Sequence, residues 1–181
     1  MRRVALLGIL SGLAAPFTFV PAASAGAGWT PVPNPYDQVQ VPANAWGGAC
    51  SFPILINTVA NNERELTTAV GPPAPIGTTL TRVRGRLVVS VTNLDTDRTI
   101  VRDVSGPTDT YAFPDGTGVE TETGNNSNLA GPLSFANTGE PVLFFTTGPV
   151  FLTFATTSSG TRYLTSFHAL RQLSACDALA G

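Results

Sequence analysis

Lysine is absent from this sequence, and histidine, methionine and cysteine are scarce. The 181 residues contain one His, one Met and two Cys, and all 10 basic residues are arginines. Zinc, copper and non-haem iron sites are usually built from two or three His or Cys ligands, so this composition argues against a transition-metal enzyme. We therefore expect no cofactor, and we assign no catalytic residue.

Charged residues are also few, at 12% of the chain, whereas hydrophobic residues make up 43%. This balance excludes a disordered or collagen-like chain and predicts one folded domain. The formal net charge is −2. Nucleic acids and anionic membrane surfaces attract clustered Lys or Arg, so the mildly acidic balance argues against both as partners.

Residues 1–25 have the three-part pattern of a secretory signal. Arg2 and Arg3 precede an apolar run from Val4 to about Val20, and small residues follow at positions 23–25. This pattern predicts cleavage before Gly26. A retained membrane anchor is the alternative, which we disfavour because the apolar run is shorter than the roughly 20 residues of a membrane-spanning helix. We expect a secreted, extracellular protein with no membrane span after signal removal and, without the two arginines, a net charge of −4.

Residues 26–49 are predicted to form an extended, proline-rich arm. Prolines break helices and favour polyproline II, and here they occupy positions 31, 33, 35 and 42. The arm also carries the aromatic residues Trp29, Tyr36 and Trp46. These could contact a ligand such as a sugar, or they could cover an open end or edge of the following domain.

Residues 50–181 read as a strand-rich domain. Short apolar runs alternate with Gly, Pro, Asn and Asp, and no run before residue 170 keeps a helical period. We predict strands at 51–59, 63–70, 78–93, 98–105, 108–113, 118–123, 141–147, 150–157 and 161–169, with a bulge or bend at Gly85. A polar loop is expected at 124–128, and a helical turn or irregular tail after residue 169. The expected fold is all-β, an antiparallel β-sandwich, with an open β-barrel as the alternative.

Cys50 and Cys176 are the only cysteines. In an oxidising compartment an even pair predicts a disulfide. A redox role is the alternative, but the sequence has no Cys-x-x-Cys motif. The bond would fasten the last segment of the chain to the first strand.

Three arginines, at positions 82, 84 and 86, alternate along one predicted strand. They could form an anion site. We favour the alternative that Glu63 and Glu65 neutralise them across a hairpin.

Two residue sets could support hydrolysis. His168 could act as a base, with Ser90, Ser134 or Ser166 as nucleophile and Asp103 or Asp109 as orienting group, but none of these serines lies in a Gly-x-Ser-x-Gly elbow. Glu120 and Glu122 would stand about 7 Å apart on one strand face, as paired carboxylates of a glycosidase could. We favour a surface histidine and a solvated glutamate face.

Two polar loops are candidate sites. Asp95 and Asp97, with Asn93, offer oxygen ligands for a weak calcium site, although Asp and Asn are equally typical of turns. Asn125, Asn126 and Asn128 lie in the second loop and could contact a ligand.

The segments Cys50–Ile54, Gly85–Asn93 and Asn137–Pro141 resemble a group of small exported actinobacterial proteins of unknown function. The resemblance extends over about residues 48–180. It implies secretion and brings no catalytic residues.

Together these features predict a secreted, non-catalytic β-sandwich protein. We expect a binding or structural role outside the cell, with an extracellular protein or glycan as partner. The alternatives are a hydrolase that uses acidic residues or His168, and an inhibitor of an extracellular enzyme.

Overall fold

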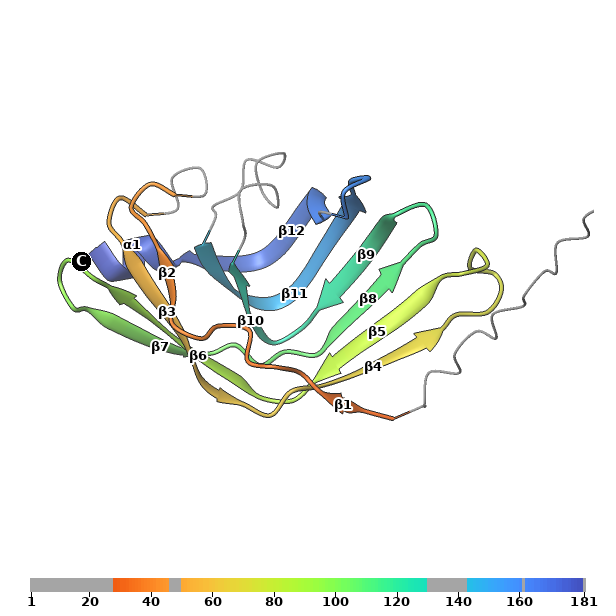
Figure 1. Cartoon of the computed structure of the whole chain (residues 1–181), viewed down its shortest axis with the longest axis horizontal. Coiled ribbons are helices and arrows are strands. Elements are labelled where there is room, and N and C mark those ends of the chain that lie inside the picture. Colours follow the sequence, from red (N-terminus) through yellow and green to blue (C-terminus); the bar gives the residue numbers. More distant parts are fainter. Residues whose placement is uncertain (1–27, 46–49, 130–142, 161, 181) are drawn as a thin grey trace, which may run out of the picture.

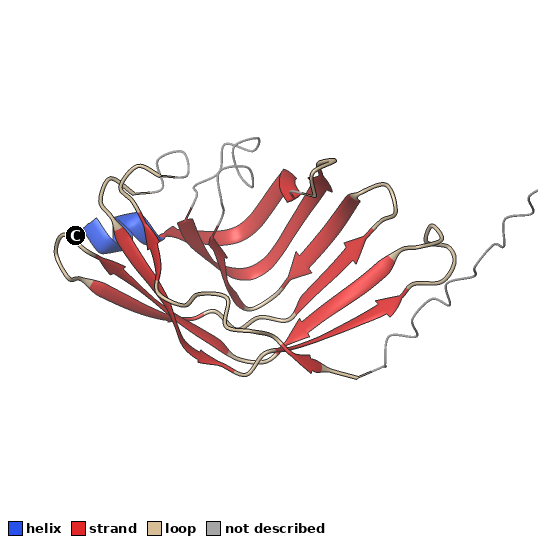
Figure 2. Cartoon of the chain, in the orientation of Figure 1, coloured by secondary structure: helices blue, strands red, loops and turns tan. Residues whose placement is uncertain are grey.

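The structure is a computed structural model that describes residues 28–45, 50–129, 143–160 and 162–180. Their regular secondary structure is β-strand, apart from one short helix near the C-terminus (Figures 1 and 2). The predicted all-β fold is confirmed. No helix among the described residues is long and apolar enough to cross a membrane.

The strands belong to two antiparallel sheets. The larger, 8-stranded sheet has the order β1-β4-β5-β8-β9-β11-β10, and β12 also pairs with β11. Its strands are β1 (Thr30–Pro31), β4 (Arg64–Ala69), β5 (Thr79–Arg84), β8 (Thr108–Ala112), β9 (Thr117–Glu122), β10 (Asn125–Leu129), β11 (Leu143–Thr156) and β12 (Arg162–Ser174). The smaller sheet has the order β2-β3-β6-β7, formed by β2 (Val39–Val41), β3 (Ile54–Asn61), β6 (Leu87–Asn93) and β7 (Thr99–Asp103). The helix is α1 (Ala175–Ala180).

The two sheets face each other over one half of the molecule only. There the smaller sheet packs against the first part of β11 and against α1, through a core that includes Ile56, Val91, Phe145 and Leu179. In the other half, β4, β5, β8 and β9 continue as a single curved layer towards β11 and β12 (Figure 1). The predicted sandwich is therefore confirmed, with a larger sheet that extends beyond the smaller one.

After β2, the chain passes from one sheet to the other three times. The crossings separate β3 from β4, β5 from β6, and β7 from β8. The single strand predicted over 78–93 is thus divided at Gly85, where the backbone has φ 135°. A left-handed φ of this kind suits glycine because other residues carry a Cβ that clashes.

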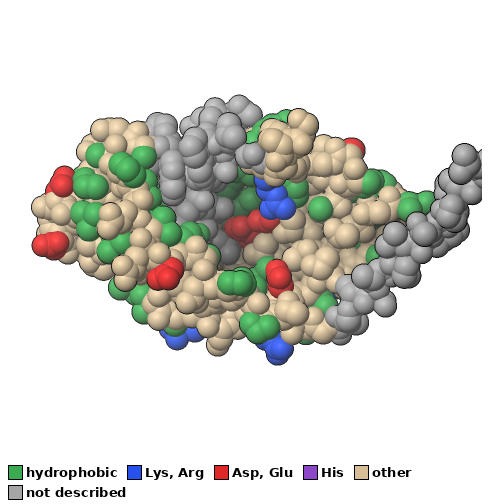
Figure 3. Space-filling view, in the orientation of Figure 1, with side chains coloured by type: hydrophobic (Ala, Val, Ile, Leu, Met, Phe, Trp, Pro, Cys, Tyr) green, Lys and Arg blue, Asp and Glu red, His purple; other side chains and the backbone are tan. Residues whose placement is uncertain are grey.

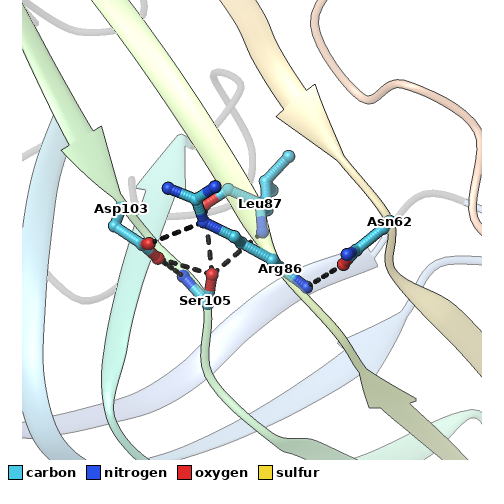
Figure 4. Close-up of polar contacts among 5 residues, drawn as sticks. All are labelled: Asn62, Arg86, Leu87, Asp103 and Ser105. Atoms are coloured by element: carbon cyan, nitrogen blue, oxygen red, sulfur yellow. Dashed lines mark hydrogen bonds and ion pairs between the residues drawn. The ribbon is translucent and has the colours of Figure 1, made fainter.

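Side chains bind the three crossings together (Figure 4). The Asn62 side chain accepts a hydrogen bond from the Arg86 N–H at 2.6 Å, and the Arg86 carbonyl accepts one from the Asn62 N–H at 2.9 Å. At the third crossing, the Ser105 hydroxyl accepts a hydrogen bond from the Leu87 N–H at 3.0 Å and lies 2.5 Å from an Asp103 carboxylate oxygen. Backbone N–H and C=O groups at these crossings are thereby hydrogen-bonded, although the chain is changing from one sheet to the other.

Three predicted boundaries are wrong in the last third of the chain. The two strands expected around Gly148-Pro149 are one strand, β11, which bends where the Gly148 N–H donates to the Gly124 carbonyl at 2.7 Å. The polar loop expected at 124–128 is the strand β10, because its backbone pairs with residues 143–147 of β11. Residues 170–174 continue β12, and the helix begins only at Ala175.

The proline-rich arm contributes an edge strand to each sheet. Its first segment, β1, pairs with β4, and its second, β2, pairs with β3. Between them, Tyr36 packs against the sandwich core. The arm therefore covers one edge of both sheets, as one of the two hypotheses for its role predicted.

The predicted disulfide joins Cys50 to Cys176, with a Cα–Cα distance of 5.3 Å. It links the residue that follows the arm to α1, and both cysteines pack into the sandwich core. The bond thus fixes the C-terminal helix over the smaller sheet.

Candidate functional site

A hollow of about 270 Å³ lies on the concave side of the larger sheet, where the arm passes over β5, β8 and β9. We call it the acidic hollow, because three carboxylates line it, those of Glu63, Glu120 and Glu122. Figure 3 shows acidic side chains at the bottom of a hollow in the middle of this face, with a basic side chain beside them. Tyr36, Thr108 and Thr110, which carry hydroxyl groups, also line the hollow, together with apolar residues that include Val32, Val83 and Val104.

Strand register explains how the carboxylates meet. Successive residues of a strand face opposite sides, so Glu120 and Glu122 share the concave face of β9. Glu120 lies opposite Thr110, and Glu122 lies opposite Thr108 on β8. The Thr110 hydroxyl donates to a Glu120 carboxylate oxygen at 2.7 Å. Each of the two glutamates of β9 therefore lies opposite a threonine of β8.

Arg162 and the Phe154 ring lie beside Glu120, at one end of the acidic hollow. The Arg162 guanidinium lies 3.9 Å from the centre of the Phe154 ring, and its Nη1 is 3.7 Å from a Glu120 carboxylate oxygen. The Phe154 ring lies directly over Gly118, where any Cβ would collide with it. Gly118 thus leaves room for the ring that supports Arg162, and Arg162 partly neutralises Glu120.

An apolar cluster continues the concave face beyond the carboxylates. Its members, all buried, are Phe144, Leu152, Phe154 and Leu164, and Phe167 packs on Phe144 with ring centres 5.0 Å apart. In the register of β9 and β11, Leu152 is the neighbour of Glu120. The carboxylates therefore lie beside a buried apolar cluster.

Burial shifts the pKa of the third carboxylate, that of Glu63. Desolvation raises the pKa of the Glu63 carboxyl above its ordinary value, because a buried charge loses its hydration. Glu63 lies in the crossing between β3 and β4, where the Asn61 side chain accepts a hydrogen bond from the Glu63 N–H at 2.8 Å. The acidic hollow thus combines a carboxyl that holds its proton more tightly than usual with two further glutamates.

The prediction of a solvated face for Glu120 and Glu122 is wrong. The Glu122 residue is only 7% exposed, and the Glu120 side chain is 16% exposed. Alternation in Thr-Glu-Thr-Glu-Thr correctly places both on one face but cannot tell a concave face from a convex one. Gly118, two residues earlier on the same face, is the signal in the sequence that close packing occurs there.

The ligand-contact candidates are divided between separate places. Tyr36 lines the acidic hollow, whereas half-buried Trp29 lies at the start of β1, where its carbonyl accepts a hydrogen bond from Arg64. Asn125 lines a different hollow. Asn126 and Asn128 pair through their backbones with Thr146 and Phe144, and Trp46 is outside the described residues.

The serine-hydrolase candidates are not brought together. His168 is exposed and lies opposite Phe151, while Asp109 binds Arg84 and Asp103 binds Arg86. The Ser166 hydroxyl contacts Thr153, Ser90 belongs to the other sheet, and Ser134 lies outside the described residues.

The arginine run is neutralised, but by other partners than expected. Arg82 and Arg84 approach Asp109, at 4.0 and 2.5 Å, and Arg86 approaches Asp103 at 3.1 Å. Glu65 lies opposite Val83, so its side chain projects from the face away from Arg82 and Arg84. The crossing at Gly85 also separates Arg86 from the other two.

The turn with Asp95 and Asp97 is exposed. The oxygen of the Asn93 side chain accepts a hydrogen bond from the Asp95 N–H at 2.9 Å, and its amide group donates to the Leu179 carbonyl at 3.4 Å. The amide thus joins this turn to α1. Among the described residues, no group of three or more His, Cys, Asp or Glu residues could hold a metal ion.

Comparison of the chain with protein-family models, with curated proteins and with solved structures gives no match.

Proposed function

We propose that the protein is an extracellular binding protein whose acidic hollow holds a neutral glycan. One observation carries the proposal, the convergence of three carboxylates, two threonine hydroxyls and a tyrosine in one hollow. Carboxylate oxygens accept hydrogen bonds from sugar hydroxyls, and these charge-assisted bonds are roughly twice as strong as neutral ones. Tyr36 adds an aromatic face for the apolar face of a sugar ring.

A neutral ligand fits better than a strongly cationic one. Arg162 lies beside Glu120 and reduces the negative charge of the hollow, and the raised pKa of Glu63 further favours an uncharged carboxyl. Secretion supports a glycan as partner. It rests on the signal pattern of residues 1–25, and the Cys50–Cys176 disulfide is compatible with an oxidising compartment.

Calorimetric titration with neutral gluco-, manno- and galacto-oligosaccharides tests the proposal. Glu120→Gln removes a charge but keeps the shape, and we expect at least about a tenfold loss of affinity, equivalent to about 1.4 kcal/mol. Asp97→Asn is the matched control, because it removes one carboxylate in an exposed turn of the other sheet and should leave affinity unchanged. Failure of every oligosaccharide to bind, or equal losses in both variants, would overturn the proposal.

Hydrolysis of the bound glycan is a second candidate. It is favoured by the pairing of a carboxyl whose pKa is raised, Glu63, with further carboxylates in the same hollow. Glycosidases use such pairs as general acid and as base or nucleophile. Release of reducing sugar that Glu63→Gln abolishes, while binding persists, would identify a hydrolase. Binding without release would leave the binding function alone.

A further inference from the structure

A second hollow, of about 370 Å³, lies between β7 and β12 and shares the lining residue Val104 with the acidic hollow. Arg102 comes from the end of β7, Asn125 from the start of β10, and Arg171 and Leu173 from the last part of β12. We call it the basic hollow after its two arginines. Since β7 pairs only with β6 and β12 only with β11 among the described strands, edge strands border it.

Its two arginines differ from the paired arginines of the chain. Asp109 binds Arg82 and Arg84, Asp103 binds Arg86, and Glu120 binds Arg162. Arg64 donates to the Trp29 carbonyl. In the part of the chain that the structure describes, Arg102 and Arg171 have neither an ion pair nor a side-chain hydrogen bond. Two cations without carboxylate partners therefore line one hollow.

The one carboxylate in the lining is already engaged. Asp103 accepts hydrogen bonds from the Ser105 hydroxyl at 2.5 Å, from the Ser105 N–H at 3.1 Å and from Arg86 at 3.1 Å. These bonds, those from Ser105 foremost, hold the pKa of Asp103 below its ordinary value. Arg86 thus balances the charge of Asp103, and the charges of Arg102 and Arg171 remain uncompensated in a chain of formal net charge −2.

The remaining lining is polar on one side and apolar on the other. Asn125 and Thr147 supply hydrogen-bonding groups, and Phe145 and Val104 form a buried apolar floor. Leu173 is the neighbour of Phe145 in the register of β11 and β12, and 43% of its surface is exposed. A ligand with a charged head and an apolar body would meet complementary groups at both ends.

We propose that the basic hollow binds the oxyanion group of a small organic acid. The guanidinium groups of Arg102 and Arg171 offer paired N–H donors that match the oxygens of a carboxylate or phosphate. Leu173 and the apolar floor contact the body of the ligand. The volume of the hollow falls at the lower end of the range of about 300–1,000 Å³ for small-molecule sites, which limits the ligand to a compact molecule.

Calorimetric titration with three probes of one shape tests the proposal. Phenylacetate supplies a carboxylate, phenyl phosphate a phosphate, and phenylacetamide a neutral control. We expect at least one anion to bind and the amide not to bind, and the relative affinities show whether the hollow prefers a carboxylate or a phosphate. Amide nitrogen shifts in NMR spectra of the wild type should concentrate at residues 102–104, 125 and 171–173.

Substitutions test whether Arg102 and Arg171 bind the anion. Arg102→Gln and Arg171→Gln should each weaken anion binding by at least about tenfold, or about 1.4 kcal/mol, and the double variant should abolish it. Arg98→Gln is the control, because Arg98 is exposed in the turn before β7 and does not line the hollow. Thermal unfolding checks that the variants fold. The proposal fails if neither anion binds, if the double variant binds as the wild type does, or if Arg98→Gln weakens binding equally.

Discussion

Gly85 approaches the backbone of Glu63 so closely that a Cβ at position 85 would stand 2.6 Å from the Glu63 Cα. Two of the three crossings between the sheets meet at this contact, and Gly85 has φ 135° there. The position of Glu63 in the acidic hollow therefore depends on the absence of a side chain at residue 85.

Gly85→Ala should destabilise the protein by more than about 2 kcal/mol. A strained φ alone costs about 1–3 kcal/mol, and the Cβ would in addition push against backbone atoms of Asn62 and Glu63, which cannot rotate away. Urea unfolding followed by circular dichroism measures the change.

Alanine substitutions at two other glycines separate the effect of the strained φ from that of the close contact. Gly160 has φ 84°, but a Cβ added there would meet no heavy atom within 4 Å, and Gly71 has neither a positive φ nor a close neighbour. We expect an intermediate loss for Gly160→Ala and little change for Gly71→Ala. Equal stability of Gly85→Ala and Gly71→Ala would contradict the close contact.

The sequence around Gly85 predicts a bend but not the change of sheet that the bend produces. Hydrophobic alternation in Leu87–Val91 and in the residues before Gly85 is the same whether the two halves belong to one sheet or two. The pairing of Arg64 with Arg84 in one sheet, and of Asn61 with Leu87 in the other, depends on contacts distant in sequence. A pattern of period two therefore predicts strands and leaves sheet membership open.

Prediction of the candidate site from local sequence patterns is limited in the same way. Local turn chemistry predicts a loop at 124–128, yet pairing with β11 makes it a strand, because a backbone ladder outweighs polar composition. Burial of Glu122 arises from the curvature of the sheet and the passage of the arm over it, which no window of neighbouring residues contains. The disulfide could be predicted because two cysteines allow only one pairing.

Loss of the Cys50–Cys176 disulfide should lower the free energy of unfolding by about 4–5 kcal/mol. The two cysteines are 126 residues apart, and the chain-entropy model gives this value for so long a loop. Urea unfolding of the Cys50→Ala/Cys176→Ala variant measures it. Reductant should destabilise the wild type and have no effect on the variant; a wild type unaffected by reductant at full reduction would contradict the prediction.

The Arg84–Asp109 ion pair should show a larger coupling energy than the Arg86–Asp103 pair. The side chains of the first pair are 39% and 31% exposed, and those of the second are 62% and 46% exposed, so water screens the second pair more. Double-mutant cycles with Gln and Asn should give about 0.5–1 kcal/mol for the first and less than about 0.5 kcal/mol for the second. The reverse order would show that exposure does not govern these pairs.

Acidic pH should favour the folded state through Glu63. Burial raises the pKa of this carboxyl from its ordinary value of 4.5, so between that value and the raised one the folded chain binds more protons than the unfolded chain. The free energy of unfolding then falls as pH rises through this interval. Glu63→Gln removes the group, and the stability of the wild type relative to this variant should fall as pH rises above 4.5 towards the raised pKa.

Asp103 should have the opposite effect to Glu63 on the pH dependence of the free energy of unfolding. Hydrogen bonds from Ser105 and Arg86 lower the pKa of this carboxyl from 3.8, so the unfolded chain binds more protons in the interval below that value. Its contribution to stability is present above pH 3.8 and is lost as pH falls through the lowered pKa. Below pH 3.8, the stability of the wild type relative to Asp103→Asn should therefore rise with pH. In this interval the stability of the wild type relative to Glu63→Gln should not yet fall. Parallel profiles for the two variants would contradict a raised pKa of Glu63, because desolvation raises the pKa of a carboxyl whereas hydrogen bonds to its charged form lower it.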